Sequence, residues 1–351
     1  DPFLFCVLPV AAIFSLCQPK MSRAILAASA IRPGPWSTPD PFLFCVYHFD
    51  QYPAGNADMG PGRTGNGADF DPSAKYRMYH GGKVPGFPKH PHRGFETITI
   101  VLEGVVDHAD SLGACGRFGE GDVQWMTAGK GISHSEMFPL RKTDGDNNLR
   151  LFQIWLNLPR AQKMSDPHFS MHWADDIPKV NVGNAARVTV YAGEYEGAKG
   201  CEPPPASYAN KAASDLAVWL IELDKSGSVV LPPAKPGSNR SLYCFTGGVT
   251  VGGQQVRQPT VFELDPSASV EVASASDTMN SCLVLQGKPI GEPVAQHGPF
   301  VMTTQQEIRE AFMDYQKSQF GGWPWKTDSP CHPRAKGRFA KYPDGREDAP
   351  K

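Results

Sequence analysis

The sequence predicts an all-β protein with two β-barrels or sandwiches of similar size and a single helix near its C-terminal end. Three features lead to this prediction. Among 351 residues, 35 are glycine and 33 are proline, which favours many short strands joined by tight turns. Runs of alternating apolar and polar residues gather in two regions, 87–160 and from Arg187 onward. The length also suggests about two domains.

The first β region contains three clear strand patterns. In ETITIVLEG (96–104), isoleucine and leucine alternate with threonine and valine, as in a half-buried strand. DVQWMTAG (122–129) and LRLFQIWLNLP (149–159) have the same character. Glycines between 104 and 121 mark the turns that separate them.

The second β region follows the same plan. Its predicted strands lie in RVTVYAG, LAVWLIEL, SLYCFTGGVTVGGQQV and NSCLVLQG. Gly252 and Gly253 stand between two apolar runs, which indicates a hairpin turn. No histidine occurs from Lys179 to Leu285, so a metal site with imidazole ligands is not expected here.

One helix is predicted late in the chain. Thr304 and Glu307 form a capping box. Apolar residues then follow at helical spacing, namely Ile308, Ala311, Phe312 and Tyr315. Residues 331–351 carry six basic and three acidic side chains and few apolar ones. We interpret the end of the chain, 326–351, as a polar, solvated tail.

Residues 1–39 are treated as an N-terminal extension outside the fold. DPFLFCV occurs at Asp1 to Val7 and again at Asp40 to Val46 with unrelated flanks, which is typical of an artefactual duplication. Met21 is a plausible start. The apolar run from Leu4 to Cys17 is interrupted by Pro9 and too short to span a bilayer, so we expect no targeting by this segment.

The composition excludes several classes of partner. The formal net charge is −2 and the charged fraction is 20%, which favours neither direct nucleic-acid binding nor a membrane surface. The eight cysteines are scattered without a CxxC pair, which indicates reduced thiols inside a cell. We expect a monomer located in the cytoplasm, the nucleus or both.

Two short motifs predict a metal site in the first β region. His90 and His92 in KHPHRGFETI are two residues apart, as are His134 and Glu136 in GKGISHSEMF. In extended backbone such pairs point to the same side. Three imidazoles and one carboxylate would form a suitable ligand set for a borderline divalent metal, with positions left open for chemistry. Iron, manganese, nickel and copper are all conceivable.

Other residues near these motifs leave alternatives open. Glu96 follows His92 at HxxxE spacing and competes with Glu136 as the fourth ligand. Arg93 is either a surface residue or a partner of a carboxylate or anionic substrate. His108 lies in the same region without a paired ligand, so we do not include it.

Several blocks resemble the pirin family. They are HPHRGFETITIVLEG, GDVQWMTAGKGISHSE, LFQIWLNLP and the segment 291–325. The resemblance implies a bicupin, with two cupin-type β-barrels packed face to face and a C-terminal helix. It implies a metal-binding cupin domain at 40–178 and a cupin domain without metal at 179–325.

The resemblance also implies a ligand set and an activity. The family's ligands correspond here to His90, His92, His134 and Glu136, which hold one divalent metal, normally Fe(II), with Mn, Ni, Cu or Zn as alternatives. Several pirins resemble quercetin 2,3-dioxygenases, which implies a flavonol-like substrate, O2 and Glu136 as catalytic base. The alternative is an iron-dependent, redox-sensing co-regulator that binds a transcription factor without turnover.

Two further expectations concern the substrate cavity. Four aromatic and apolar residues near the motifs are candidates for its wall, although we favour ordinary core packing for each: Phe95, Trp125, Met126 and Phe152. Residues 50–86, rich in Gly, Pro, Asn and Asp, are longer than the corresponding connection in the family. They could narrow the cavity, but we favour a surface insertion.

Overall fold

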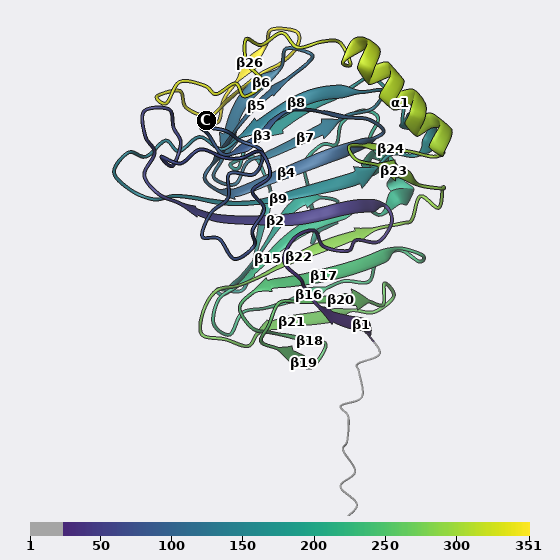
Figure 1. Ribbon diagram of the computed structural model, residues 1–351. Helices are drawn as coiled ribbons and strands as arrows, with labels where there is room; N and C mark the ends of the chain where they lie inside the picture. The colour runs from purple at the N-terminus through teal and green to yellow at the C-terminus, as the bar shows by residue number, and fades with distance from the viewer. Residues whose placement is uncertain (1–23) are drawn as a thin grey trace, which may run out of the picture.

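The chain folds into two stacked β-barrels, the first above the second in Figure 1. The structure, a computed structural model, describes residues 24–351. The first barrel closes two antiparallel sheets on one another. One has the strand order β10-β7-β4-β9-β2, with β2 (Phe42–Tyr52), β4 (Phe95–Glu103), β7 (Val123–Thr127), β9 (Asn147–Asn157) and β10 (His168–His172). The other has the order β26-β25-β6-β5-β8-β3, with β3 (Gly86–His92), β5 (Val105–Asp110), β6 (Cys115–Gly119), β8 (Ile132–Met137), β25 (Phe339–Lys341) and β26 (Glu347–Asp348).

The second barrel is built in the same way. Its larger sheet has the order β1-β20-β17-β22-β15-β12-β11, with β1 (Ile25–Ala30), β11 (Lys179–Val182), β12 (Ala186–Ala192), β15 (Ala217–Leu223), β17 (Asn239–Thr246), β20 (Thr260–Leu264) and β22 (Asn280–Gly287). The smaller sheet has the order β16-β21-β18-β19, with β16 (Ser228–Leu231), β18 (Val249–Val251), β19 (Gln254–Val256) and β21 (Val270–Ser274). The predicted hairpin at Gly252 and Gly253 is confirmed, since it joins β18 to β19.

The remaining elements are short, apart from one helix. They comprise the two-stranded ribbons β13 (Glu194–Tyr195) with β14 (Ala198–Lys199) and β23 (Ala295–His297) with β24 (Phe300–Met302). Three 3-10 turns are η1 (Arg160–Gln162), η2 (Tyr208–Asn210) and η3 (Ala212–Ser214). Among the described residues, no helix is long and apolar enough to cross a membrane.

Helix α1 (Gln305–Ser318) confirms the predicted helix and its capping box. The Thr304 hydroxyl accepts from the Glu307 amide, while the Glu307 carboxylate accepts from the Thr304 amide. These two bonds satisfy amide groups that the first turn would otherwise leave unpaired. Ile308 and Ala311 are buried against β23 and β24, so the helix covers one end of the first barrel (Figure 1).

The five-stranded sheet of the first barrel packs face to face on the seven-stranded sheet of the second, as the family resemblance implied. One apolar cluster contains residues of β4, β7 and β9 together with residues of β12, β15 and β22. Trp36 lies in this cluster and stacks on Tyr243 of the second barrel, with ring centroids 5.0 Å apart. The buried Glu96 carboxylate accepts from the Ser207 hydroxyl, which belongs to the second half of the chain.

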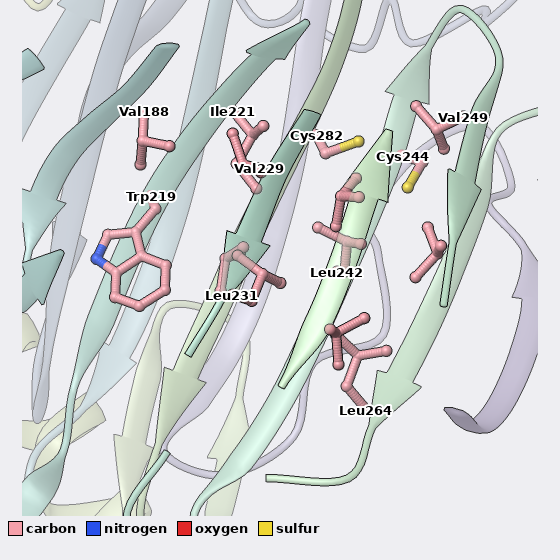
Figure 2. Close-up of a cluster of buried hydrophobic side chains, with 14 of the residues drawn as sticks. Val188, Trp219, Ile221, Val229, Leu231, Leu242, Cys244, Val249, Leu264 and Cys282 are labelled. Atoms are coloured by element: carbon pink, nitrogen blue, oxygen red, sulfur yellow. The ribbon is translucent and has the colours of Figure 1, made fainter. Parts of the chain in front are cut away.

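The interior of the second barrel is filled by apolar side chains. Figure 2 shows Val188, Trp219, Ile221, Leu242 and their neighbours pointing toward one another between its two sheets. All these side chains are almost completely buried. Close packing of this kind leaves little room for a ligand, so a functional site is expected in the first barrel.

Both ends of the described chain contribute to the fold, although we had placed residues 1–39 outside it and interpreted 326–351 as a solvated tail. β1 pairs with β20 of the second barrel, although it precedes the whole first barrel in sequence. The expected solvated tail was also wrong, because β25 pairs with β6 and Phe339 is buried. The duplicate segment at 1–7 and the candidate start Met21 lie outside the described residues.

Candidate metal centre

The two motifs that predicted a metal site lie on neighbouring strands. His90 and His92 belong to β3, and His134 and Glu136 belong to β8. The strands are antiparallel partners, with His90 directly opposite His134. Because alternate residues of a strand face the same side, both pairs point into the first barrel.

A glycine-rich turn aligns β8 for this role. Gly131 precedes the strand at a φ of +135°, a conformation that favours glycine. A Cβ atom at this position would lie 2.6 Å from the ring of Phe320. Gly131 is therefore needed for the chain to enter β8 beneath the segment that follows α1.

The three imidazoles converge on one point. Their ring centroids are 4.8 Å apart for His90 and His92, 4.4 Å for His90 and His134, and 4.9 Å for His92 and His134. One nitrogen from each ring lies within 4.8 Å of the others. A single ion between them could therefore contact all three nitrogens.

The hydrogen bonds of these histidines leave nitrogens free for a metal. His90 Nδ1 lies 2.9 Å from the Pro88 carbonyl oxygen, and His92 Nδ1 lies 3.4 Å from that of Pro299. A carbonyl only accepts, so each Nδ1 is the donor and each Nε2 keeps its lone pair. Both nitrogens of His134 are buried without a protein partner. Unpartnered buried nitrogens are costly, and a bound metal would satisfy one of them.

Burial also sets the charge of the site. Desolvation lowers the pKa of His90 to about 4 and lowers the pKa of His92 and His134 well below the usual value. Mutual repulsion among the imidazoles acts in the same direction for His92 and His134. The rings are therefore neutral at physiological pH, which is the protonation state that binds a metal.

Glu136 lies beside the three histidines and is fixed by two donors. Its carboxylate oxygen is 3.9 Å from His134 Nε2. It accepts from the Thr99 hydroxyl at 3.2 Å and from the Gln153 amide at 3.0 Å. Burial raises the pKa of Glu136. The structure thus places a carboxylate next to the ion site, and its role as a ligand stays a prediction.

Glu96, the competing ligand, faces the opposite side of its sheet. On β4 it shares a face with Ile98 and Ile100, which pack against the second barrel, whereas Thr99 faces Glu136. Its carboxylate accepts from Thr127, Ser207 and Trp125. Desolvation raises the pKa of Glu96 to about 7. It connects the two barrels and does not reach the three histidines.

Replacing Glu96 with glutamine is therefore expected to leave the metal content of the purified protein unchanged. The amide oxygen of glutamine can still accept from some of the three side chains that donate to Glu96. Only the contact between the barrels is therefore weakened. Elemental analysis of wild type and Glu96→Gln, purified in parallel, checks this. Loss of the metal in this variant would restore Glu96 as a ligand.

His90, His92 and Glu136 line a cavity of about 620 Å³ with a largely aromatic wall, while His134 lies behind them. The wall includes Phe44, Tyr47, Phe49, Phe70, Phe87, Phe138 and Trp155. None of the four residues that we had considered for this wall lines it. Trp125 and Phe152 belong to the contact between the barrels, while Phe95 and Met126 are fully buried. The core-packing interpretation was correct for them.

The long connection after β2 is not a surface insertion, so the interpretation that we favoured was wrong. Phe70, Pro72, Arg77 and Tyr79 from this connection line the cavity. Tyr79 is almost completely buried, and residue 79 forms bridges with residues 69 and 86. The aromatic residues within this Gly- and Asp-rich segment were the sequence feature that could have indicated its packing against the barrel.

Arg93 and His108 lie near the site without entering the cavity. The Arg93 guanidinium pairs with Asp314 of α1 at 2.8 Å and donates to the Lys130 carbonyl. It therefore fixes the helix over the barrel end. His108 Nε2 lies 3.2 Å from Asp110, and its ring centroid is 5.6 Å from that of His134.

Comparison with known proteins adds to this picture. The family model "Pirin" matches residues 67–156, and "Pirin C-terminal cupin domain" matches 218–321. Human pirin is 33% identical over 260 residues, which are 72% of this chain and 84% of that protein. A Pseudomonas aeruginosa protein, whose name assigns it provisionally to the quercetin 2,3-dioxygenases, is 38% identical over 255 residues, covering 72% and 82%.

Solved structures of similar fold include proteins named as quercetin 2,3-dioxygenases. A quercetin 2,3-dioxygenase from Acinetobacter baumannii is 28% identical, with a TM-score of 0.67, over 86% of this chain and 99% of its own. A second A. baumannii structure of the same name has a TM-score of 0.57 at 24% identity, over 83% and 97%. The latter likeness concerns the fold alone.

Proposed function

This chain belongs to the pirin family, and we propose that it is a metal-dependent dioxygenase of the quercetin 2,3-dioxygenase type. Three neutral imidazoles and a buried carboxylate at the end of an aromatic cavity carry this proposal. An aromatic wall suits a flat, apolar substrate, and the polar groups at one end would fix its orientation. The names of the relatives support the same reaction class.

We propose one Fe(II) ion held by His90, His92, His134 and Glu136. Three nitrogens and one oxygen fit iron among the first-row metals, and four ligands leave positions open for a substrate. When bound, the metal would supply Lewis acidity that lowers the pKa of a chelated flavonol hydroxyl. The remaining work is assigned to the protein's own residues.

Glu136 would accept the proton of that hydroxyl. Its pKa is raised by burial, which makes it a stronger base than an exposed carboxylate. The Thr99 and Gln153 side chains hold the carboxylate in one orientation. The aromatic wall excludes water around the deprotonated flavonol. Dioxygen would then open the electron-rich ring, both oxygen atoms entering the product as carbon monoxide leaves.

An aerobic assay with iron-loaded protein tests the proposed activity. Flavonol absorbance should fall only when metal is present, with one carbon monoxide released per flavonol consumed. Protein loaded with manganese, nickel, copper or zinc identifies the metal that supports turnover best. Absence of turnover with every one of these metals would contradict the proposal and leave the co-regulator alternative.

Replacing Glu136 with glutamine is expected to retain part of the metal but to reduce kcat by roughly 10²- to 10⁴-fold, the usual contribution of a general base. Glutamine preserves the shape and can still accept from Thr99, but it cannot take up a proton. Metal content and kcat are measured on the same sample. Glu120→Gln, an exposed carboxylate of the same barrel, is the control. Unchanged flavonol cleavage in Glu136→Gln would remove its role as base.

A further inference from the structure

The cavity has a second set of polar groups, away from the three histidines. His48 of β2 lines it together with Tyr79 from the long connection. The ring of Phe87 lies between the two sets, with its centroid 6.0 Å from that of His48 and 6.2 Å from that of His90. A substrate held at the metal centre could therefore extend past Phe87 toward His48.

The hydrogen bonds around Tyr79 define the tautomer of His48. The Tyr79 hydroxyl donates to the Asp50 carboxylate at 2.7 Å. That carboxylate also accepts from the backbone amide and the guanidinium of Arg77, both at 2.9 Å. A carboxylate that receives three donors is the ionised, accepting form.

His48 must then donate to Tyr79. The two atoms, His48 Nδ1 and the Tyr79 hydroxyl oxygen, are 2.7 Å apart. Because the single hydroxyl proton is directed to Asp50, the proton in this bond comes from Nδ1. Burial lowers the pKa of His48 to about 3, so the ring is neutral and Nε2 carries a lone pair. No protein donor to Nε2 is found in residues 24–351.

Residues 24–351 place no free cation at the same end of the cavity. Arg77 is the basic side chain in the wall there, and all three of its guanidinium nitrogens already donate. Their acceptors are the carbonyl oxygens of Asp71, Phe49 and Pro72 and the Asp50 carboxylate. A carboxylate or phosphate group on the substrate would have no counter-charge, whereas a hydroxyl group could donate to His48.

We infer that His48 is a specificity-determining residue that accepts a hydrogen bond from a hydroxyl group on the part of the substrate remote from the metal. The long connection would supply this specificity through Tyr79, which orients His48. The substrate class is then a flat aromatic molecule with a hydroxyl group besides those that chelate the metal. The inference rests on the proposed function, since it assumes that such a molecule binds at the metal centre.

Half-exposed aromatic side chains mark the entrance for such a molecule. Phe49 and Phe70 line the cavity, yet 48% and 49% of their surfaces remain exposed. Exposed phenylalanines beside a polar acceptor fit a planar ring with a polar substituent. Since Phe70 belongs to the long connection, both the entrance and the orientation of the acceptor depend on this segment.

Two ligands that share the chelating group test the inference. Quercetin carries several further hydroxyl groups, whereas 3-hydroxyflavone carries only the chelating one. Binding of each is measured without oxygen, by calorimetry on iron-loaded wild type, His48→Phe and Tyr79→Phe. Phenylalanine keeps the ring contacts of His48 with Tyr79 and Phe87 but removes the acceptor. His168→Phe, an exposed histidine outside this cavity, is the control.

Wild type is expected to prefer quercetin by about three- to tenfold, the effect of one hydrogen bond. His48→Phe should lose this preference while its affinity for 3-hydroxyflavone and its metal content stay unchanged. Tyr79→Phe should show a smaller preference than wild type, because His48 can then adopt the other tautomer. His168→Phe should behave as wild type.

The possible failures are distinguishable. If wild type binds both flavonols and His48→Phe retains the preference for quercetin, the role of His48 is wrong and the proposed function stands. The same conclusion follows if His48→Phe weakens both ligands equally. If metal-loaded wild type binds neither flavonol, the proposed function fails and this inference fails with it.

Discussion

Replacing His134 with alanine is expected to remove nearly all bound metal, with affinity falling more than about 100-fold. Changes to residues that merely support a metal ligand cost 10- to 100-fold, and His134 would be a direct ligand. Flavonol cleavage should be lost with the metal. Elemental analysis and competition with a chelator measure the loss.

The fold should survive this substitution, because neither nitrogen of His134 has a protein partner to lose. The cost is limited to the cavity left by the imidazole, and far-ultraviolet circular dichroism checks that the barrel persists. His108→Gln is the matched control, since His108 is equally buried in the same barrel. Retention of a full metal equivalent by His134→Ala would overturn the ligand assignment. Equal losses in both variants would add His108 to it.

The parts of the fold that the sequence predicted depend on local patterns. The alternation in residues 96–104 corresponds to β4, and the capping box at Thr304 begins α1. Such features are set by neighbours in sequence, through alternation of side chains in strands and hydrogen bonds within one helical turn. They are therefore visible without any knowledge of long-range contacts.

The site was predictable to the extent that its residues come in pairs. Spacing alone predicts that the two members of each pair share one face of a strand, His90 with His92 and His134 with Glu136. Glu96 could not be excluded in this way. Its side is decided by which face of β4 packs against the second barrel, and that is a property of the assembled sheets.

The second polar end of the cavity was hidden for a similar reason. His48 and Tyr79 are 31 residues apart and meet only because the long connection folds back over β2. The connection has no strand or helix periodicity, so its composition indicates a loop. Burial of Tyr79 is a tertiary effect, which composition does not report.

For the C-terminal segment, the charged composition led to a wrong expectation of solvent exposure. Six basic residues between 331 and 351 suggested solvation, but Arg334 and Arg338 donate to the first barrel, and the backbone of this segment is bound by a buried side chain. Arg117 of β6 is fully buried and donates to the carbonyl oxygens of His332, Pro333 and Lys336 at 2.9, 2.9 and 2.7 Å. A buried arginine in the first barrel therefore holds the tail in place.

Replacing Arg117 with methionine is expected to lower the free energy of unfolding by about 3–5 kcal/mol, the cost of breaking a buried ion pair on one side. The guanidinium makes two bonds to Asp107, at 2.6 and 2.8 Å. Without it, Asp107 is a buried carboxylate that has lost its ion-pair partner and keeps a bond from the His332 amide, and three tail carbonyls lose their donor. The tail should detach from β6. Urea unfolding measures the stability, and limited trypsin digestion measures the exposure of Arg334 and Lys336.

Two further variants separate the buried charge from the loss of tail contacts. Asp107→Asn combined with Arg117→Met removes both charges, so it should recover part of the stability while the tail stays sensitive to trypsin. Arg338→Met breaks a partly exposed pair with Asp122, which keeps two backbone donors, and should cost only about 1 kcal/mol. If Arg117→Met lowers the free energy of unfolding by less than Arg338→Met does, the buried arginine is not what holds the tail. The tail is then held mainly by the pairing of β25 with β6. In that case the tail carbonyls would satisfy themselves with water when the guanidinium is removed.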